Sequence, residues 1–157
     1  MDAAVQSGLS TELNGDEGIV LKVYDDKTGK PIGPGSTLVG YPTIGVGRNL
    51  TTRGITLSEA SMMEMTDIAQ MEEDLVPLLP WLPALSTGRQ VAVYSLYFNV
   101  ALGNPQKFIG PAGWPVFLEQ MASGQFAAAA QNLRTSQPWA TEVGPRSGRL
   151  ADLVQYG

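Results

Sequence analysis

The chain has 157 residues, of which 43% are hydrophobic and 16% are charged, so we expect it to fold around a substantial apolar core. It contains no histidine and no cysteine, which excludes disulfide bonds, cysteine nucleophiles, Ser-His triads and nearly all zinc sites. If the chain is a hydrolase, its proton chemistry must come from Asp, Glu, Lys or Tyr, and carboxylates are the obvious choice. The net charge of −5 argues against nucleic-acid binding, which needs a basic surface.

The distribution of apolar and charged residues shows neither the pattern of a membrane-spanning segment nor that of a signal peptide. No apolar run is long enough to cross a bilayer, so we expect no stable membrane insertion. The first ten residues lack a basic segment and a long apolar stretch, so we expect no signal peptide. Between Glu59 and Asp74 the chain carries six acids and no base, which we interpret as a solvated helix face.

The first fifty residues predict a short helix followed by a small antiparallel sheet. Residues 3–14 favour a helix that ends just before Glu17. Residues 21–24 (LKVY) alternate and predict a strand, while residues 36–40 (STLVG) and 43–47 (TIGVG) predict a second and a third. The intervening stretch is rich in Gly and Pro and must turn.

The remainder of the chain predicts helices. Thr56 and Glu59 have the spacing of a capping box at the start of a long helix. The apolar residues of that helix repeat at helical spacing at Ile68, Met71, Leu75, Leu78 and Leu79. We interpret the methionines at positions 62, 63, 65 and 71 as flexible core filler.

A strongly apolar stretch at residues 86–102 predicts a central buried helix, where Thr87 and Gln90 again have capping-box spacing. Three shorter helices are expected after it, separated by Gly, Ser and Pro. The elements together predict an α+β fold, in which a small antiparallel β lobe of about residues 15–55 and a larger all-α lobe of residues 1–14 and 56–157 flank a cleft. We expect residues 1–157 to form a single domain.

Two carboxylates near the first strand are candidates for catalysis. Glu17 and Asp26 lie nine residues apart, and the strand between them spans roughly 13 Å. Both could therefore face one cleft, as the cleavage of a glycosidic bond by an acid and a base requires. Two acids at this spacing also occur by chance, and Glu17 could simply pair with Arg146. Asp25 competes with Asp26, but the spacing favours Asp26, and we interpret Asp25 as a solvated turn acid.

The full pattern is more specific. The stretches DEGIVLKVYDD (residues 16–26), YPTIGVGRNLT (residues 41–51) and GITLSEA (residues 54–60) resemble the phage-type lysozymes, the endolysin family that includes the lysozyme of the T-even phages. The resemblance covers about residues 13–153. It implies a lysozyme-like fold and an N-acetylmuramidase, a glycoside hydrolase that requires no cofactor and no metal.

The resemblance also implies roles for individual residues. Glu17 would be the general acid, and Asp26 with the Thr43 hydroxyl would orient the attacking water. Thr43 alone could be an ordinary strand residue, and Phe98 could equally belong to the core. Arg146 matches an arginine that the family places against the catalytic glutamate, and the residues that fall where the family contacts sugar are Asn49, Phe98 and Asn132.

The expected function is that of a phage endolysin that hydrolyses the β-1,4 bond between N-acetylmuramic acid and N-acetylglucosamine in peptidoglycan, with inversion. The alternatives are a lytic transglycosylase, or a virion or wall-binding protein of lysozyme fold with little turnover. Peptidoglycan is the expected partner of a monomeric protein. We expect the protein in the host cytoplasm, reaching the wall through a separate export or holin route.

The sequence departs from the family pattern in ways that bear on the site. The loop between Asp26 and Thr43 is longer than in the T-even enzyme, and we expect its residues 27–40 to be mobile and to lie at the rim of the cleft. Arg48 stands where relatives often carry a histidine, and it could still pair with an acid. Many relatives are basic, so the acidic net charge of this chain argues against strong affinity for the cell wall more than against the catalytic reaction.

Overall fold

The computed structural model describes residues 1–16 and 18–157, so the predicted general acid, Glu17, lies outside the described residues. The chain divides into two compact units, Met1–Ser61 and Met62–Gly157. The described part is mostly helical and carries one three-stranded antiparallel sheet, so the predicted α+β class is confirmed. The grouping of residues 1–14 with residues 56–157, and the cleft between the lobes, stay predictions.

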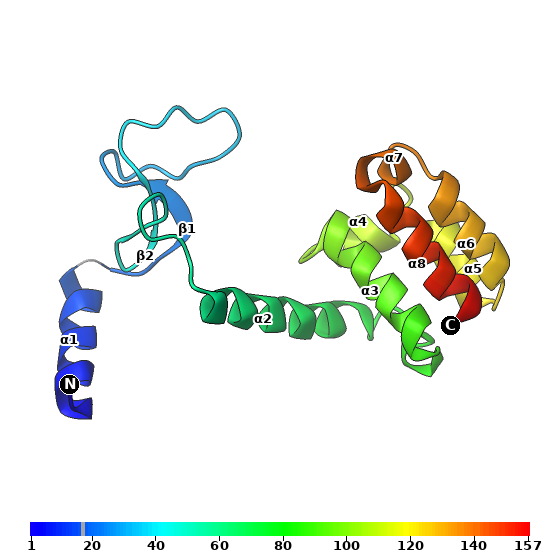
Figure 1. Cartoon of the computed structure of the whole chain (residues 1–157), viewed down its shortest axis with the longest axis horizontal. Coiled ribbons are helices and arrows are strands. Elements are labelled where there is room, and N and C mark those ends of the chain that lie inside the picture. The colour runs from blue at the N-terminus through cyan, green and yellow to red at the C-terminus, as the bar shows by residue number, and fades with distance from the viewer. Residues whose placement is uncertain (17) are drawn as a thin grey trace. The chain divides into compact units, whose positions relative to one another are not determined.

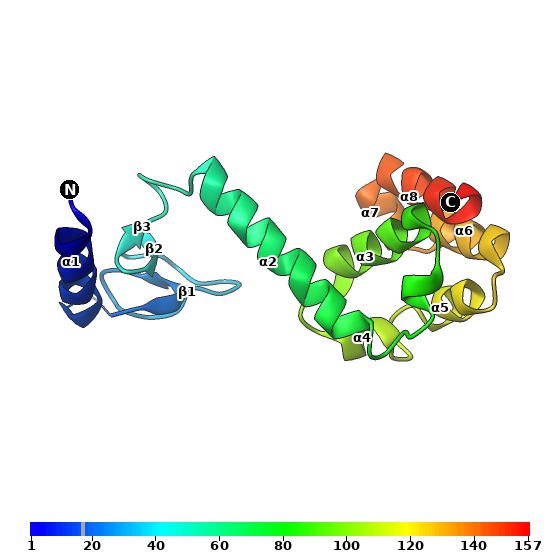
Figure 2. The ribbon, with the colours of Figure 1, turned by 90° about the horizontal axis from the view of Figure 1, so that it is seen from below.

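The first unit holds the first helix, the sheet and the first residues of α2 (Leu57–Leu75) (Figure 2). Its elements are α1 (Ala3–Asp16), β1 (Val20–Asp25), β2 (Pro42–Gly45) and β3 (Arg48–Asn49). The strands lie in the order β1-β2-β3, so β2 is central. Thr43 on β2 is paired with Tyr24 on one side and with Asn49 on the other. The two strands expected at residues 21–24 and 43–47 are therefore present.

The strand expected at residues 36–40 is not formed. The chain instead turns back directly after β1, where Tyr24 forms an isolated bridge with Pro31 and the amide of Ile32 donates to the carbonyl of Val23. The amides of Val39 and Gly40 donate to the carboxylate of Asp25. A backbone N–H that is bound by a side-chain carboxylate is not available to a strand ladder, which explains the difference.

The predicted capping box at the start of α2 (Leu57–Leu75) is confirmed. Thr56 donates its amide (2.8 Å) and its hydroxyl (2.9 Å) to Oε2 of Glu59, and the amide of Glu59 donates to the Thr56 hydroxyl at 3.2 Å. Arg48 donates to the same Oε2 at 2.7 Å and to the carbonyl of Gly54 at 3.1 Å. Arg48 does therefore pair with an acid, and it joins β3 to the start of α2.

The second unit is built from short helices around an apolar core (Figure 1). Its elements after α2 are η1 (Leu82–Ala84), α3 (Thr87–Ala101), α4 (Pro105–Ile109), α5 (Pro115–Ala122), α6 (Phe126–Thr135), α7 (Trp139–Val143) and α8 (Pro145–Tyr156). Helix α8 lies along both α3 and α6 in Figures 1 and 2. Helix α3 is the predicted central helix. None of the described helices is both long and apolar enough to cross a membrane.

Two predictions about helix ends and faces were wrong. Thr87 and Gln90 do not form a capping box, because the Gln90 side chain donates to the carbonyl of Leu85 at 2.7 Å. The methionines at positions 62, 63 and 65 are exposed rather than core filler. On the predicted apolar face of the long helix Ile68 and Leu78 are also exposed, and the buried positions follow one stripe, at Met71, Leu75 and Leu79.

Candidate functional site

Asp26 lies directly after β1 and exchanges two hydrogen bonds with the backbone of Tyr41. The amide of Asp26 donates to the carbonyl of Tyr41 at 3.1 Å, and the amide of Tyr41 donates to Oδ1 of Asp26 at 2.7 Å. Within the described part of the chain Oδ2 of Asp26 accepts no hydrogen bond. The carboxylate is exposed and borders a hollow of about 630 Å³ between Lys27 and residues 39–41. One oxygen is held in place, and the other is open to a water or a ligand.

Thr43 is buried, at 3% exposure, at the centre of the sheet. Its Oγ1 donates to the carbonyl of Tyr41 at 3.1 Å, the same carbonyl that accepts from the amide of Asp26. The hydroxyl proton is therefore committed, and the lone pairs of Oγ1 remain as acceptors. The structure thus joins two of the sequence-predicted residues, Asp26 and Thr43, through the peptide carbonyl of Tyr41.

Asp25 is buried, at 4% exposure, so its interpretation as a solvated turn acid was wrong. Its Oδ1 accepts from the amides of Lys27 and Thr28, both at 3.0 Å, and its Oδ2 from those of Val39 (2.6 Å) and Gly40 (3.0 Å). These hydrogen bonds, led by that from Gly40, lower the pKa of Asp25 from 3.8 to about 2 against the opposing effect of burial. With all its bonding capacity used locally, Asp25 is a structural acid, and Asp26 is the available one.

Gly40 allows the close approach of the two arms of the loop. A Cβ at this position would overlap with Oδ1 of Asp26 and would lie 2.9 Å from the amide nitrogen of Lys27. Any larger residue would therefore push the Asp26 carboxylate from its place. Sequence reasoning treated this glycine as general loop composition and missed its direct relation to the site.

Asn49, a predicted sugar-contacting residue, lies opposite Thr43 in the sheet. Its Oδ1 accepts from the amides of Thr51 (2.9 Å) and Thr52 (3.0 Å), so this oxygen caps the turn after β3. The side-chain NH2 group remains for a ligand. Asn49 therefore has a structural role in this turn, and its contact with sugar stays a prediction.

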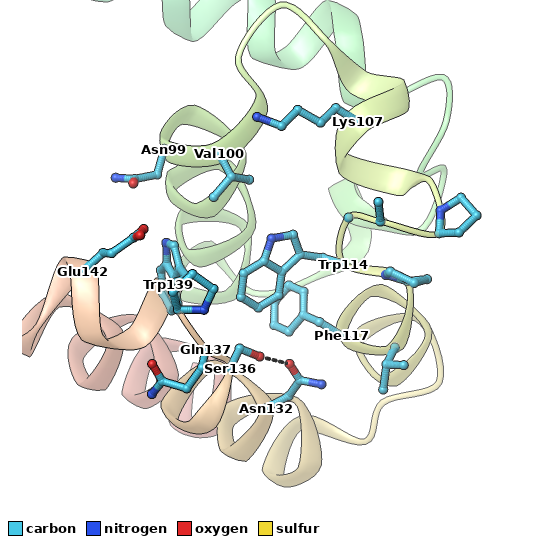
Figure 3. Close-up of a pocket in the computed structure, with 16 residues that line it drawn as sticks. Asn99, Val100, Lys107, Trp114, Phe117, Asn132, Ser136, Gln137, Trp139 and Glu142 are labelled. Carbon is cyan, nitrogen blue, oxygen red and sulfur yellow. Dashed lines mark hydrogen bonds between the residues drawn. The ribbon is translucent and has the colours of Figure 1, made fainter.

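Asn132 lies in the second unit, on α6, at a pocket of about 640 Å³ (Figure 3). Oδ1 of Asn132 accepts from the Ser136 hydroxyl at 2.8 Å. The indoles of Trp114 and Trp139 line the pocket and meet edge to face, with ring centroids 5.3 Å apart. The buried Nε1 of Trp139 has no hydrogen-bond partner among the described residues.

The pocket around Asn132 was only partly anticipated. Its polar rim also includes Asn99, Lys107 and Glu142 (Figure 3). The sequence singled out Asn132 alone. The two tryptophans, in the dipeptides GW (residues 113–114) and PW (residues 138–139), were the available signal, because a large amphipathic ring beside a helix start is a common lining of ligand pockets.

Phe98 and Arg146 line another pocket of the second unit, of about 620 Å³ and bordered by α2 and α3. Phe98 is 45% exposed, so the alternative that it belongs to the core was wrong. Arg146 at the start of α8 donates from Nη2 to the hydroxyl (2.8 Å) and the carbonyl (3.3 Å) of Ser95. Ser95 therefore holds the guanidinium, and the glutamate expected against it lies outside the described residues.

Within residues 1–16 and 18–157 there is no cluster of three or more carboxylates that could hold a metal ion.

Comparison with known proteins corrects the expected identity. No protein-family model matches the chain. The chain is 28% identical over 166 residues to the pre-baseplate central spike protein Gp5 of Enterobacteria phage T4. The match covers 95% of this chain but 28% of that protein, so the chain spans less than a third of its relative's length. The assignment to the phage endolysins was wrong in this respect, because the similarity found is to a protein of the phage baseplate. A short sequence motif carries no information on which phage protein contains it.

Proposed function

We propose that the chain is a peptidoglycan-hydrolysing glycosidase unit that cleaves the β-1,4 bond between N-acetylmuramic acid and N-acetylglucosamine. The observation that carries the proposal is the arrangement of Asp26 and Thr43 around the Tyr41 peptide. Such a bond is broken by one carboxylic acid that protonates the leaving oxygen and one carboxylate that acts on the opposite face of the sugar. Glu17 and Asp26 are proposed for these two roles.

The hydrogen bonds around Tyr41 favour a water-directing role for Asp26. The proton of the Thr43 hydroxyl points to a carbonyl, so Oγ1 is left as an acceptor. Oδ2 of Asp26 is also an acceptor, because Oδ1 takes the Tyr41 amide. A water that donates one proton to each would turn its oxygen lone pair toward the anomeric carbon. In this proposal the reaction inverts the anomeric centre, since the water attacks the sugar directly.

Substrate binding is proposed for the residues that the motif comparison selected. Asn132 lies in a pocket with two indoles, and aromatic faces with a few polar groups are a common lining for sugar and peptide ligands. Phe98 presents an exposed ring, and Asn49 retains its NH2 group beside the strand of Thr43. Arg146 is proposed as a supporting cation that is held by Ser95.

The setting proposed for this activity is a phage tail or baseplate component. The match to the T4 spike protein extends over 95% of the chain, which suits a unit carried within a larger virion protein. Such a unit would act on the wall from outside, so the proposal replaces the export route expected from the sequence. The same match favours a second candidate, a structural unit of a spike with no turnover.

Purified peptidoglycan and mass analysis of the released ends test the proposal. We expect the wild-type chain to release reducing N-acetylmuramic acid ends, and Glu17→Gln and Asp26→Asn to release none. Asp26→Asn keeps an Oδ1 acceptor for the Tyr41 amide, so its loop is expected to stay intact. Anhydro ends would identify a transglycosylase and refute the water-directing role. The absence of any product from the folded wild-type chain would favour the structural unit.

The proposed inversion of the anomeric centre is tested by a separate measurement. NMR of the first-formed sugar end should show the α-anomer, because inversion at a β-linkage produces it. An initial β-anomer would contradict direct attack by a water held between Asp26 and Thr43.

A further inference from the structure

We propose that Asp25 is a positioning residue for Asp26, one that acts by clamping the two arms of the long loop together. The inference rests on the proposed function for its catalytic consequence. That Asp25 clamps the loop rests on the hydrogen bonds of Asp25 itself. It assigns separate tasks to the two neighbouring acids of the sequence.

The Asp25 carboxylate reaches both arms of the loop. Oδ1 takes the amides of Lys27 and Thr28 on the outgoing arm of the loop. Oδ2 takes the amides of Val39 and Gly40 on the returning arm. One buried side chain thus bridges segments that lie more than ten residues apart in sequence.

The charge of the Asp25 carboxylate strengthens its hydrogen bonds. Hydrogen bonds from N–H groups to an ionised carboxylate are shorter and about twice as strong as neutral ones. The shortest of the four, from Val39, measures 2.6 Å. The backbone of Asp25 adds to the clamp, because its amide donates to Lys30 (2.9 Å) and its carbonyl accepts from Gly29 (2.8 Å). The turn at residues 25–30 is therefore held by hydrogen bonds of both the backbone and the side chain of Asp25.

Tyr41 links this clamp to Asp26. The returning arm reaches Tyr41 directly after Gly40, and the Tyr41 amide is the donor to Oδ1 of Asp26. The position of that amide depends on where the clamp holds Val39 and Gly40. Release of the returning arm would move Tyr41, and with it both the Asp26 carboxylate and the acceptor of the Thr43 hydroxyl.

Asp25→Asn is the informative variant. An asparagine offers one carbonyl oxygen and one NH2 group. The two backbone amides of one arm would therefore face the NH2 group, which cannot accept their hydrogen bonds. Two of the four hydrogen bonds are then lost, while the size of the side chain is kept. We expect the variant to fold, because the other two hydrogen bonds, the backbone hydrogen bonds of the turn and the three-stranded sheet are kept.

The first measurement is the steady-state hydrolysis of soluble peptidoglycan glycan chains by the full chain. We expect Asp25→Asn to lower kcat at least about tenfold and to change KM less than about twofold, because misplacement of a catalytic group by about 1 Å has effects of this size. Thr56→Ala is the matched control, since it removes hydrogen bonds of the same unit without contact to the loop. The control should keep the wild-type kcat below its melting temperature.

The second measurement is hydrogen exchange of the Tyr41 amide by NMR, which does not depend on activity. We expect exchange at Tyr41 to accelerate at least about tenfold in Asp25→Asn, because the hydrogen bond to Asp26 opens more often. The amide of Ala60, which bonds to the carbonyl of Thr56, should exchange as in the wild type.

The outcomes separate the inference from the proposed function. Unchanged Tyr41 exchange in Asp25→Asn would overturn the inference, and so would a wild-type kcat in that variant. A wild-type chain without turnover would end the proposed function, and the Tyr41 exchange rate alone would then decide whether Asp25 positions Asp26.

Discussion

Asp26 and Tyr41 exchange two hydrogen bonds, one from the Asp26 amide to the Tyr41 carbonyl at 3.1 Å and one from the Tyr41 amide to Oδ1 of Asp26 at 2.7 Å. A pair of this kind holds both the backbone and the side chain of the acid. The Tyr41 carbonyl also accepts from Thr43 Oγ1. The peptide groups of Tyr41 thus hold the two described members of the proposed catalytic set.

Gly40→Ala tests the close approach beside this pair. A Cβ would overlap with Oδ1 of Asp26, so we expect the carboxylate to move and the release of reducing ends to fall about tenfold or more. Gly33→Ala is the control from the same loop, because a Cβ there meets nothing within 4 Å. Equal activity of the two variants in a peptidoglycan assay would contradict the role of Gly40.

Thr43→Val tests the hydroxyl. Valine keeps the shape of the buried side chain and removes the bond to Tyr41, so we expect a loss of about 1 kcal/mol in the free energy of unfolding. Hydrolysis should fall far more, because the water loses one of its two acceptors. Thr43→Ser retains the hydroxyl and should keep most of the activity. Denaturant unfolding and the reducing-end assay measure the two effects, and a fully active Thr43→Val variant would remove Thr43 from the mechanism.

The capping box of α2 predicts a dependence of stability on pH. Hydrogen bonds from the Thr56 backbone, then from Arg48 and the Thr56 hydroxyl, lower the pKa of Glu59 from 4.5 to about 2. Because the folded-state pKa is the lower one, ionised Glu59 stabilises the fold above pH 4.5, and this stabilisation is lost as the pH falls toward 2. Asp25 acts in the same direction between 3.8 and about 2.

Glu59→Gln separates the two acids. Glutamine can still accept from the Thr56 amide, but it loses the charge and the ion pair with Arg48. Melting temperatures measured from pH 6 to pH 2 should therefore fall less steeply for Glu59→Gln than for the wild type. Parallel curves for the two proteins would show that Glu59 does not contribute to acid sensitivity.

Trp139→Phe tests the pocket of the second unit. The variant removes the buried Nε1, which has no partner among the described residues, and keeps an aromatic ring. We expect the free energy of unfolding to fall, because the smaller ring leaves a cavity beside Trp114, and removal of the unpartnered Nε1 offsets only part of this cost. If Nε1 donates to substrate, KM for glycan chains should rise about 3–10-fold, the equivalent of one hydrogen bond. An unchanged KM would exclude this donor from substrate binding, and Trp114→Phe provides the comparison for the same chemical change at the neighbouring indole of the pocket.

Features that depend on neighbours along the chain could be predicted from the sequence. The capping box of Thr56 and Glu59 was predicted correctly because its partners lie three residues apart and need no tertiary contact. The first strand and the central helix α3 followed from their apolar patterns for the same reason. The order of Glu17, Asp26 and Thr43 along the chain predicted carboxylate chemistry, and this stays a prediction.

The difference between the two adjacent acids, by contrast, arises from tertiary contacts. Asp25 caps the local turn through the amides of Lys27 and Thr28. Its second oxygen is bound because Val39 and Gly40 approach it from the far end of a loop. The same approach removed the strand expected at residues 36–40, since its amides bind a carboxylate. The pocket at Asn132 likewise gathers Trp114 and Trp139 from separate helix starts. Contacts of this range depend on how the chain closes its loops and packs its core, and no periodicity or spacing along the sequence encodes them.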